Sequence, residues 1–231
     1  MENNKIIFKN DENLSKIEID INNYSNDLIK SLNVPNNTDL ISGKYEGGIK
    51  IWECALDLIN FLPTKYSKSN LSNLNVLELG CGHGLPGIYF LLKGCNVTFQ
   101  DFNKEVLENI TNNYIVQLKD KYNFDYFKNV EYISGDWGDF KCNKKFNIII
   151  SGDTLYNIDN YEKIFNILKN YLEKEGIALF STKKFYYGVG GSSSEFIYFI
   201  ESKNLFEINK INEINDGVSN IRLILEIKWK K

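Results

Sequence analysis

Histidine is nearly absent from this chain, and its few cysteines are far apart. The 231 residues include 1 His and 4 Cys. The cysteines are Cys54, Cys81, Cys95 and Cys142, with no C-x-x-C pair among them. This pattern indicates neither a zinc site nor a disulfide framework. We therefore expect no bound metal and a reduced, intracellular setting.

Long apolar runs and an excess of positive charge are missing as well. No stretch approaches the roughly 20 apolar residues that a membrane-spanning helix requires. The formal net charge of -3 and the pI of about 5.4 do not fit a protein whose main task is to grip nucleic-acid backbones. With 43% hydrophobic residues, the chain can fill the core of one domain. We expect a soluble monomer that binds neither membranes nor nucleic acid directly.

The chain divides into an arm of residues 1–40 and a domain of residues 41–231. The arm is rich in Asn and Asp, and the alternating stretch 16–21 is typical of an edge strand. We expect the arm to be an accessory lid or partly disordered. At the start of the domain, apolar residues at helical spacing predict a helix over 50–62, which Pro63 should end.

From residue 75 onward, strand and helix patterns alternate. Such alternation predicts β-α-β units with parallel strands and right-handed crossovers, whereas the last two strands predict an antiparallel hairpin. The expected fold is therefore α/β, a Rossmann-like seven-stranded sheet with helices on both faces and a C-terminal antiparallel hairpin. The expected strands are 75–79, 96–100, 130–134, 146–151, 177–181, 206–211 and 220–228, and the expected helices are 86–92, 104–118, 160–172 and 194–202.

The first of these strands runs directly into the alternating glycines Gly80, Gly82 and Gly84. Backbone without a Cβ can approach a ligand closely, and open α/β sheets bind ligands at the carboxyl ends of their strands. The loop also matches G-x-G-x-x-G, and Asp101 ends the second strand where a ribose-binding acid is expected. A nicotinamide nucleotide and S-adenosylmethionine are thus both candidate cofactors.

Three features favour S-adenosylmethionine. Glu78 precedes the glycines within the strand, as is common where an acid holds the charged end of an amino-acid cofactor. Asp136 and Trp137 follow the third strand and offer an acid for an adenine amino group and an indole to lie against its ring. The terminal hairpin is the third feature. The sequence therefore predicts a methyltransferase, with a nicotinamide enzyme as the alternative.

Several longer motifs point to one family. Taken together and in order, from about residue 40 to the end, they resemble the histidine protein methyltransferases that act on a large-subunit ribosomal protein, a branch of the seven-β-strand methyltransferases. The segments that carry the resemblance are Tyr45-Glu46-Gly47-Gly48-Ile49-Lys50-Ile51-Trp52-Glu53-Cys54, the glycine loop, Phe99-Gln100-Asp101-Phe102-Asn103, Ser134-Gly135-Asp136-Trp137, Ser151-Gly152-Asp153-Thr154-Leu155-Tyr156-Asn157 and Lys183-Lys184-Phe185-Tyr186-Tyr187-Gly188-Val189-Gly190-Gly191.

The resemblance implies a role for each matching position. Substrate would be a ribosomal protein, methylated on the ring nitrogen distal to the main chain, in the cytosol or the nucleus. The 183–191 loop would hold the target peptide. The implied cofactor contacts are Gly80, Gly82 and Gly84 to the methionine part, Asp101 to the ribose, Asp136 and Trp137 to the adenine, and Trp52 with Glu53 as the closing wall; the residues facing the acceptor would be Asp153 with Thr154, Tyr156 and Asn157.

Some positions depart from the family pattern or have two interpretations. His83 stands where a small residue is usual, and we expect it to face solvent; Asp153 stands where the family tends to have Glu. Asp153 either accepts the proton-bearing ring nitrogen of a target histidine or caps the helix that begins near residue 157. Trp52 lines either the cofactor pocket or only the core. Lysine methylation and a scaffold for ribosome assembly without turnover remain alternative functions.

Overall fold

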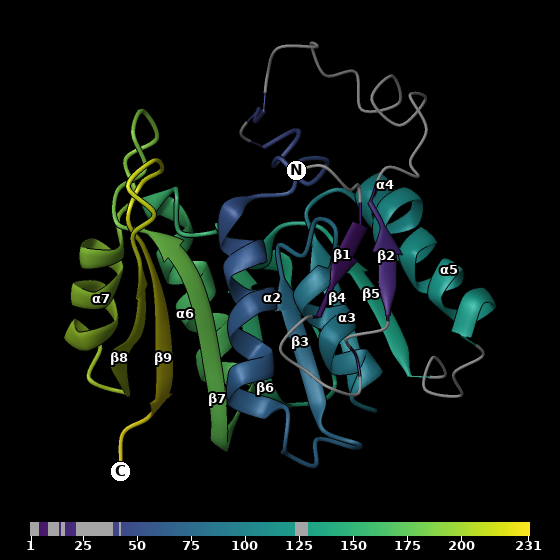
Figure 1. Ribbon diagram of the computed structural model, residues 1–231. Helices are drawn as coiled ribbons and strands as arrows, with labels where there is room; N and C mark the ends of the chain where they lie inside the picture. The colour runs from purple at the N-terminus through teal and green to yellow at the C-terminus, as the bar shows by residue number, and fades with distance from the viewer. Residues whose placement is uncertain (1–4, 9–13, 15–16, 22–38, 42, 123–128) are drawn as a thin grey trace.

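The computed structural model describes residues 5–8, 14, 17–21, 39–41, 43–122 and 129–231. Their main feature is a seven-stranded sheet of order β5-β4-β3-β6-β7-β9-β8 (Figure 1). The strands β3 to β7 are parallel, and β9 pairs antiparallel with both β7 and β8. The predicted α/β sheet with a terminal hairpin is thus confirmed. The strands are β3 (Asn75–Leu79), β4 (Asn96–Asp101), β5 (Val130–Ser134), β6 (Phe146–Gly152), β7 (Leu172–Lys183), β8 (Phe206–Ile214) and β9 (Arg222–Trp229).

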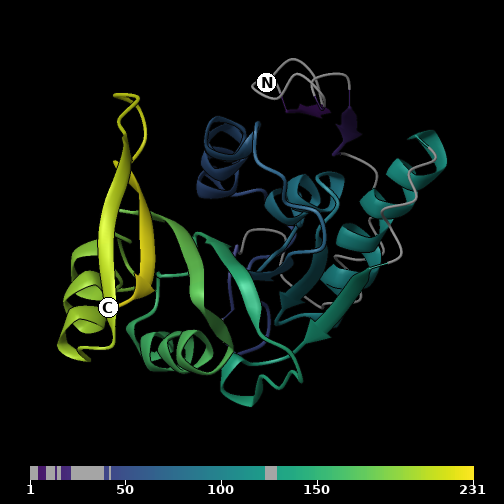
Figure 2. The same cartoon turned by 90° about the horizontal axis from the view of Figure 1, so that it is seen from below.

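Helices cover both faces of the sheet and create two separate cores (Figure 2). Consecutive residues of a strand point to opposite faces, so Val76 belongs to one core and Leu77 to the other. The first core is covered by α2 (Glu53–Tyr66), α3 (Leu85–Leu92) and α5 (Asn112–Tyr122), and the second by α6 (Tyr161–Tyr171) and α7 (Ser193–Ser202).

A small second sheet lies beside α5. Its strands β1 (Lys5–Ile7) and β2 (Glu18–Asp20) are antiparallel, and the backbone N–H of Glu18 donates to the Tyr122 hydroxyl at 3.0 Å. The alternating stretch therefore contains a strand, which pairs within this small sheet and not with the main one. Most of the predicted arm of residues 1–40 lies outside the described residues.

Several predicted boundaries were wrong, including the end of β8, which extends to Ile214. Helix α2 continues through Pro63 to Tyr66, because both residues are buried on the apolar side of the helix and this packing offsets the hydrogen bond that proline removes. The predicted helix 104–118 is divided into α4 (Lys104–Val106), a π-helical turn (Leu107–Thr111) and α5. Strand β7 begins at Leu172, earlier than predicted, because its first residue already pairs with β6 ahead of a bulge.

The N-terminus of α7 offers a test of local stability. The Ser192 side chain accepts the backbone N–H of Glu195 and donates its own hydroxyl hydrogen to the Glu195 carboxylate, so Ser192 is the N-cap of α7. We expect Ser192→Ala to lower the free energy of unfolding by about 1 kcal/mol. Urea denaturation measures this, with the exposed Ser194→Ala as the matched control. Equal midpoints for the two variants would contradict the assignment.

Candidate active site

A cavity of about 260 Å³ opens at the carboxyl edge of the parallel strands. Its walls are the segments that follow β3, β4, β5 and β6, and its cover is the segment 43–52 that leads into α2. Strand β3 is the switch point of the sheet, because it neighbours β4 on one side and β6 on the other. Open α/β sheets bind their ligands at such a point. This cavity is therefore the candidate functional site.

Glycine backbone lines the cavity beneath its cover. Gly80 and Gly82 have φ values of 58° and 49°, a left-handed conformation that residues with a Cβ rarely adopt. A Cβ on Gly82 would lie 3.2 Å from the carbonyl oxygen of Gly48 in the cover. A Cβ on Gly80 would lie 2.7 Å from the Thr154 side chain and 3.3 Å from the indole of Trp137. The absence of side chains thus lets the cover and the opposite wall pack closely against the loop.

The Asp101 carboxyl group stands beside this loop. It accepts the backbone N–H of Gly82 at 2.8 Å and that of Asn103 at 3.0 Å. Asp101 is only 4% exposed, and burial raises its pKa to about 6 although the two N–H groups favour the anion. The negative charge of Glu46 raises this pKa further. The group that the sequence predicted to bind ribose is thus a buried acceptor in the cavity wall.

Gln100 joins the ends of three strands around the opposite wall. Its Oε1 accepts the indole N–H of Trp137 at 2.6 Å and the backbone N–H of Gly80 at 3.2 Å, while its Nε2 donates to the Gly135 carbonyl at 2.8 Å. The indole is therefore fixed in the wall. Asp136 also lines the cavity, but its carboxylate accepts the Gly138 N–H at 2.6 Å and pairs with Lys163 at 2.8 Å.

His83 supports the glycine loop, so the expectation that it faces solvent was wrong. It is 4% exposed, with Nε2 2.7 Å from the Ile49 carbonyl and Nδ1 2.9 Å from the Tyr114 hydroxyl. Burial lowers the pKa of His83 to about 4, which keeps the ring neutral at pH 7. Thr111, at the end of the π-helical turn, donates its hydroxyl to the Gly82 carbonyl at 2.7 Å. His83 and Thr111 thus fix the glycine loop to the cover segment and to the π-helical turn.

Three residues that were predicted to contact the cofactor, Glu53, Glu78 and Gly84, do not line the cavity. Glu53 instead pairs with Lys183 at 2.9 Å. Glu78 is buried and accepts the backbone N–H of Gly87 at 2.8 Å, which satisfies the start of α3. Burial raises the pKa of Glu78 well above its usual value. Gly84 faces away from the cavity, since a Cβ there would meet Thr111 at 2.6 Å and Phe99 at 3.0 Å. Glu78 and Gly84 therefore support the glycine loop on the side that faces away from the cavity.

The cover segment is tied to the far side of the cavity. The Tyr156 hydroxyl donates to the Glu46 carboxylate, and the Trp52 indole N–H donates to the Gly47 carbonyl at 3.0 Å. Glu46, Trp52 and Tyr156 all line the cavity. Trp52 is therefore a wall residue and not only part of the core. Asn157 also lines the cavity, and its side chain caps the short helix at 158–160.

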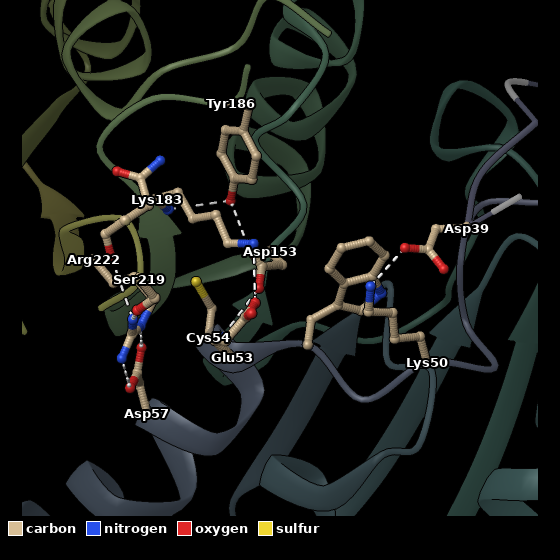
Figure 3. Close-up of polar contacts among 12 residues, drawn as sticks. Asp39, Lys50, Glu53, Cys54, Asp57, Asp153, Lys183, Tyr186, Ser219 and Arg222 are labelled. Carbon is tan, nitrogen blue, oxygen red and sulfur yellow. Dashed lines mark hydrogen bonds and ion pairs between the residues drawn. The ribbon is translucent and has the colours of Figure 1, made fainter. Parts of the chain in front are cut away.

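Asp153 lies in the cavity wall at the centre of a polar cluster (Figure 3). One carboxylate oxygen accepts the backbone N–H of Cys54 at 3.1 Å, near the start of α2. The other accepts the Tyr186 hydroxyl at 2.9 Å and lies 3.9 Å from the Lys183 ammonium. Lys183 also pairs with Glu53 at 2.9 Å. Asp153 therefore caps α2 and does not cap the helix near residue 157.

The structure brings most of the predicted site residues into one cavity. Residues that sequence reasoning did not assign to the site include Glu46, Lys50, Asp159 and Lys163, which line the cavity, and Gln100 and Thr111, which bind the glycine loop. Glu46 and Gln100 lie inside recognised motifs, but no spacing rule distinguishes their side chains. The predicted residues that line the cavity are Trp52, Gly80, Gly82, Asp101, Asp136, Trp137, Asp153, Thr154, Tyr156 and Asn157.

Solved structures define the class of fold. The glycopeptide N-methyltransferase MtfA, in complex with S-adenosyl-L-methionine, matches with a TM-score of 0.57 at 14% identity, over 77% of this chain and 94% of that chain. The magnesium protoporphyrin IX methyltransferase of Synechocystis matches with a TM-score of 0.59 at 14% identity, over 87% and 90%. The fold is therefore that of the Rossmann-like methyltransferases.

Sequence comparison gives the family. A family described as "Lysine methyltransferase" matches residues 38–203, and the chain belongs to it. Histidine protein methyltransferase 1 homologs are similar over most of the chain: that of Dictyostelium discoideum is 45% identical over 197 residues, 84% of this chain and 61% of its own length. That of Bos taurus is 34% identical over 90% of this chain and 62% of its own length. The chain thus spans about three fifths of these relatives.

The Asp153 cluster generates a stability prediction. Asp153 has a φ of 59°, a conformation that Asp and Asn tolerate better than other residues with a side chain. Asp153→Ala should lower the free energy of unfolding by roughly 2–3 kcal/mol, because the buried Cys54 N–H and Tyr186 hydroxyl lose their acceptor. Asp153→Asn retains one acceptor oxygen and should cost less than half as much. Guanidinium denaturation measures both variants, and an equal loss would refute the capping role.

Proposed function

We propose that this chain is an S-adenosylmethionine-dependent protein methyltransferase that methylates a histidine side chain of a large-subunit ribosomal protein. One observation carries the proposal. Glycine backbone, the buried Asp101 carboxyl group and the polar side chains that follow β6 all line the same cavity. Similarity to relatives named histidine protein methyltransferase 1 homolog supports the target residue. A ribosomal partner would place the reaction in the cytosol or the nucleus.

The residues of the cavity fit the proposed cofactor. Asp101 offers carboxylate oxygens to a ribose diol, and the fixed Trp137 indole offers a surface for adenine. Gly80 and Gly82 line the cavity with backbone that carries no Cβ, which a ligand can approach closely. Five acidic residues and two lysines line the cavity, so its charge favours a cationic ligand. The acidic residues are Glu46, Asp101, Asp136, Asp153 and Asp159, and the lysines are Lys50 and Lys163.

The proposed chemistry asks little of the protein beyond positioning. When bound, S-adenosylmethionine supplies a methyl group on a positively charged sulfur, which a nucleophile displaces in line. An imidazole with an ordinary pKa near 6.5 is mostly neutral and nucleophilic at pH 7. The cavity therefore has to exclude water, align the ring and accept the hydrogen of the ring nitrogen that does not react. No residue needs to deprotonate the nucleophile beforehand.

Lysine methylation is the second candidate, favoured by the description of the matching family. A lysine ammonium must lose a proton before it can attack, which calls for a desolvated site and a nearby base. Both carboxylate oxygens of Asp153 are already bonded to the protein. A neutral imidazole needs no such deprotonation, so histidine methylation requires less of the cavity than lysine methylation does.

Methyl transfer itself is the decisive test. The chain is incubated with methyl-labelled S-adenosylmethionine and protein extracted from large ribosomal subunits, and the labelled protein is hydrolysed and separated into amino acids. We expect label in methylhistidine, and none with Gly82→Val, whose side chain would approach the Gly48 carbonyl. Label in methyllysine would favour the second candidate, and cofactor binding without label would favour an assembly scaffold.

Asp101 predicts how cofactor affinity depends on pH. A ribose hydroxyl donates to the ionised carboxylate, so affinity should be highest above the pKa of about 6 and fall as pH drops through it. Between pH 7 and pH 5 we expect about a tenfold loss of affinity for S-adenosylmethionine. Isothermal titration calorimetry measures it. Asp101→Asn should bind more weakly at pH 7 and lose this pH dependence, and an unchanged slope in that variant would exclude the role.

A further inference from the structure

A tyrosine and a glutamate meet across the cavity from segments 110 residues apart. The Tyr156 hydroxyl donates to one carboxylate oxygen of Glu46. The other oxygen of Glu46 accepts the backbone N–H of Gly43 at 2.7 Å, and the backbone N–H of Glu46 donates to Asn103 Oδ1 at 3.1 Å. Glu46 is therefore held at both its backbone and its side chain. Both of its oxygens act as acceptors, which a carboxylate can do and a carboxamide cannot.

Tyr156 is equally fixed. Its backbone carbonyl accepts the Gly191 N–H at 2.9 Å, and its ring packs edge-to-face on Tyr186 with centroids 6.4 Å apart. Burial and the neighbouring Glu46 raise the pKa of Tyr156, so the phenol keeps its proton. Among the described residues, Glu46 is the hydrogen-bond partner of this hydroxyl. Its single hydrogen is thus committed, and its oxygen can only accept from a further group.

Asp153 is less suited to orient an acceptor than its place in the sequence predicts. One of its oxygens caps α2 through Cys54, and the other holds Tyr186. Asp153 lines the cavity, yet its side chain is only 3% exposed. Tyr156 lines the same cavity, is more exposed than Asp153, and has acceptor capacity to spare. Tyr156 therefore presents to the cavity a phenol oxygen that can accept a hydrogen bond but has no hydrogen left to donate.

We propose that Tyr156 selects the nitrogen that is methylated and that Glu46 is the positioning residue that sets the direction of its hydroxyl. The inference rests on the proposed function. The Tyr156 oxygen accepts the N–H of a neutral target imidazole, which leaves the lone pair of the other ring nitrogen facing the methyl group. This lone pair forms the new N–C bond, and the electron pair of the broken C–S bond stays on sulfur. The remaining N–H proton of the methylimidazolium passes through the Tyr156 hydroxyl to Glu46 and then to solvent.

The ratio of the two methylhistidine isomers tests this proposal. The wild-type chain and Glu46→Gln are incubated with methyl-labelled S-adenosylmethionine and large-subunit ribosomal protein, and the hydrolysates are separated by chromatography. The wild type should give one isomer. In Glu46→Gln the amide cannot accept from both Gly43 and Tyr156, so the hydroxyl loses its fixed direction. We expect selectivity for the nitrogen to fall about tenfold, and kcat to fall more than KM rises.

Two further variants complete the experiment. Tyr156→Phe removes the accepting oxygen and should lose the same selectivity, whereas Glu213→Gln changes an exposed glutamate paired with Lys210 and should leave the isomer ratio unchanged. A merely structural role for Glu46 would lower total label without changing the ratio. One isomer at the wild-type ratio in both Glu46→Gln and Tyr156→Phe would overturn the inference. No methylhistidine from the wild type would overturn the proposed function, and this inference with it.

Discussion

At the carboxyl edge of the sheet, the chain continues past the ends of the strands, and backbone N–H groups there need acceptors other than a neighbouring strand. Buried N–H groups without partners are costly, and four side chains from strand ends supply what is missing. Asp101 accepts from Gly82 and Gln100 from Gly80, which shapes the glycine loop. The active-site wall is thus built by the same hydrogen bonds that make this edge of the sheet stable. The other two acceptors, Glu78 for Gly87 and Asp153 for Cys54, satisfy the starts of α3 and α2.

This arrangement gives several buried polar residues near the cavity a structural role. Glu78 caps α3 from the neighbouring strand, and Asp153 does the same for α2. A carboxylate near a helix N-terminus is stabilised by the helix dipole as well as by the N–H group. These acids hold the cover and the loop at fixed distances from the sheet. The hydrogen bonds that cap α2 and α3 therefore also help to set the width of the cavity.

The sheet could be predicted from the sequence because its strands are short apolar runs with clear turn signals between them. The glycine loop, Asp101 and Trp137 could be placed for the same reason, since each follows directly after a strand. His83 could not, because its burial depends on Tyr114, which lies 31 residues away in α5. The partnership of Glu46 with Tyr156 crosses 110 residues. Side-chain contacts of that range leave no periodic signal in a sequence.

The donor and acceptor roles of the side chains in the cavity wall determine which methyl acceptor fits there. Asp153 is almost fully buried and binds Cys54 and Tyr186, whereas the more exposed Tyr156 hydroxyl donates its hydrogen to Glu46 and can accept one from a ligand. A neutral imidazole matches such a wall, because it brings one N–H donor and one nucleophilic lone pair on opposite sides of a rigid ring. An ammonium brings three donors and no lone pair. It would have to lose a proton before it could attack, a step that the neutral imidazole does not need.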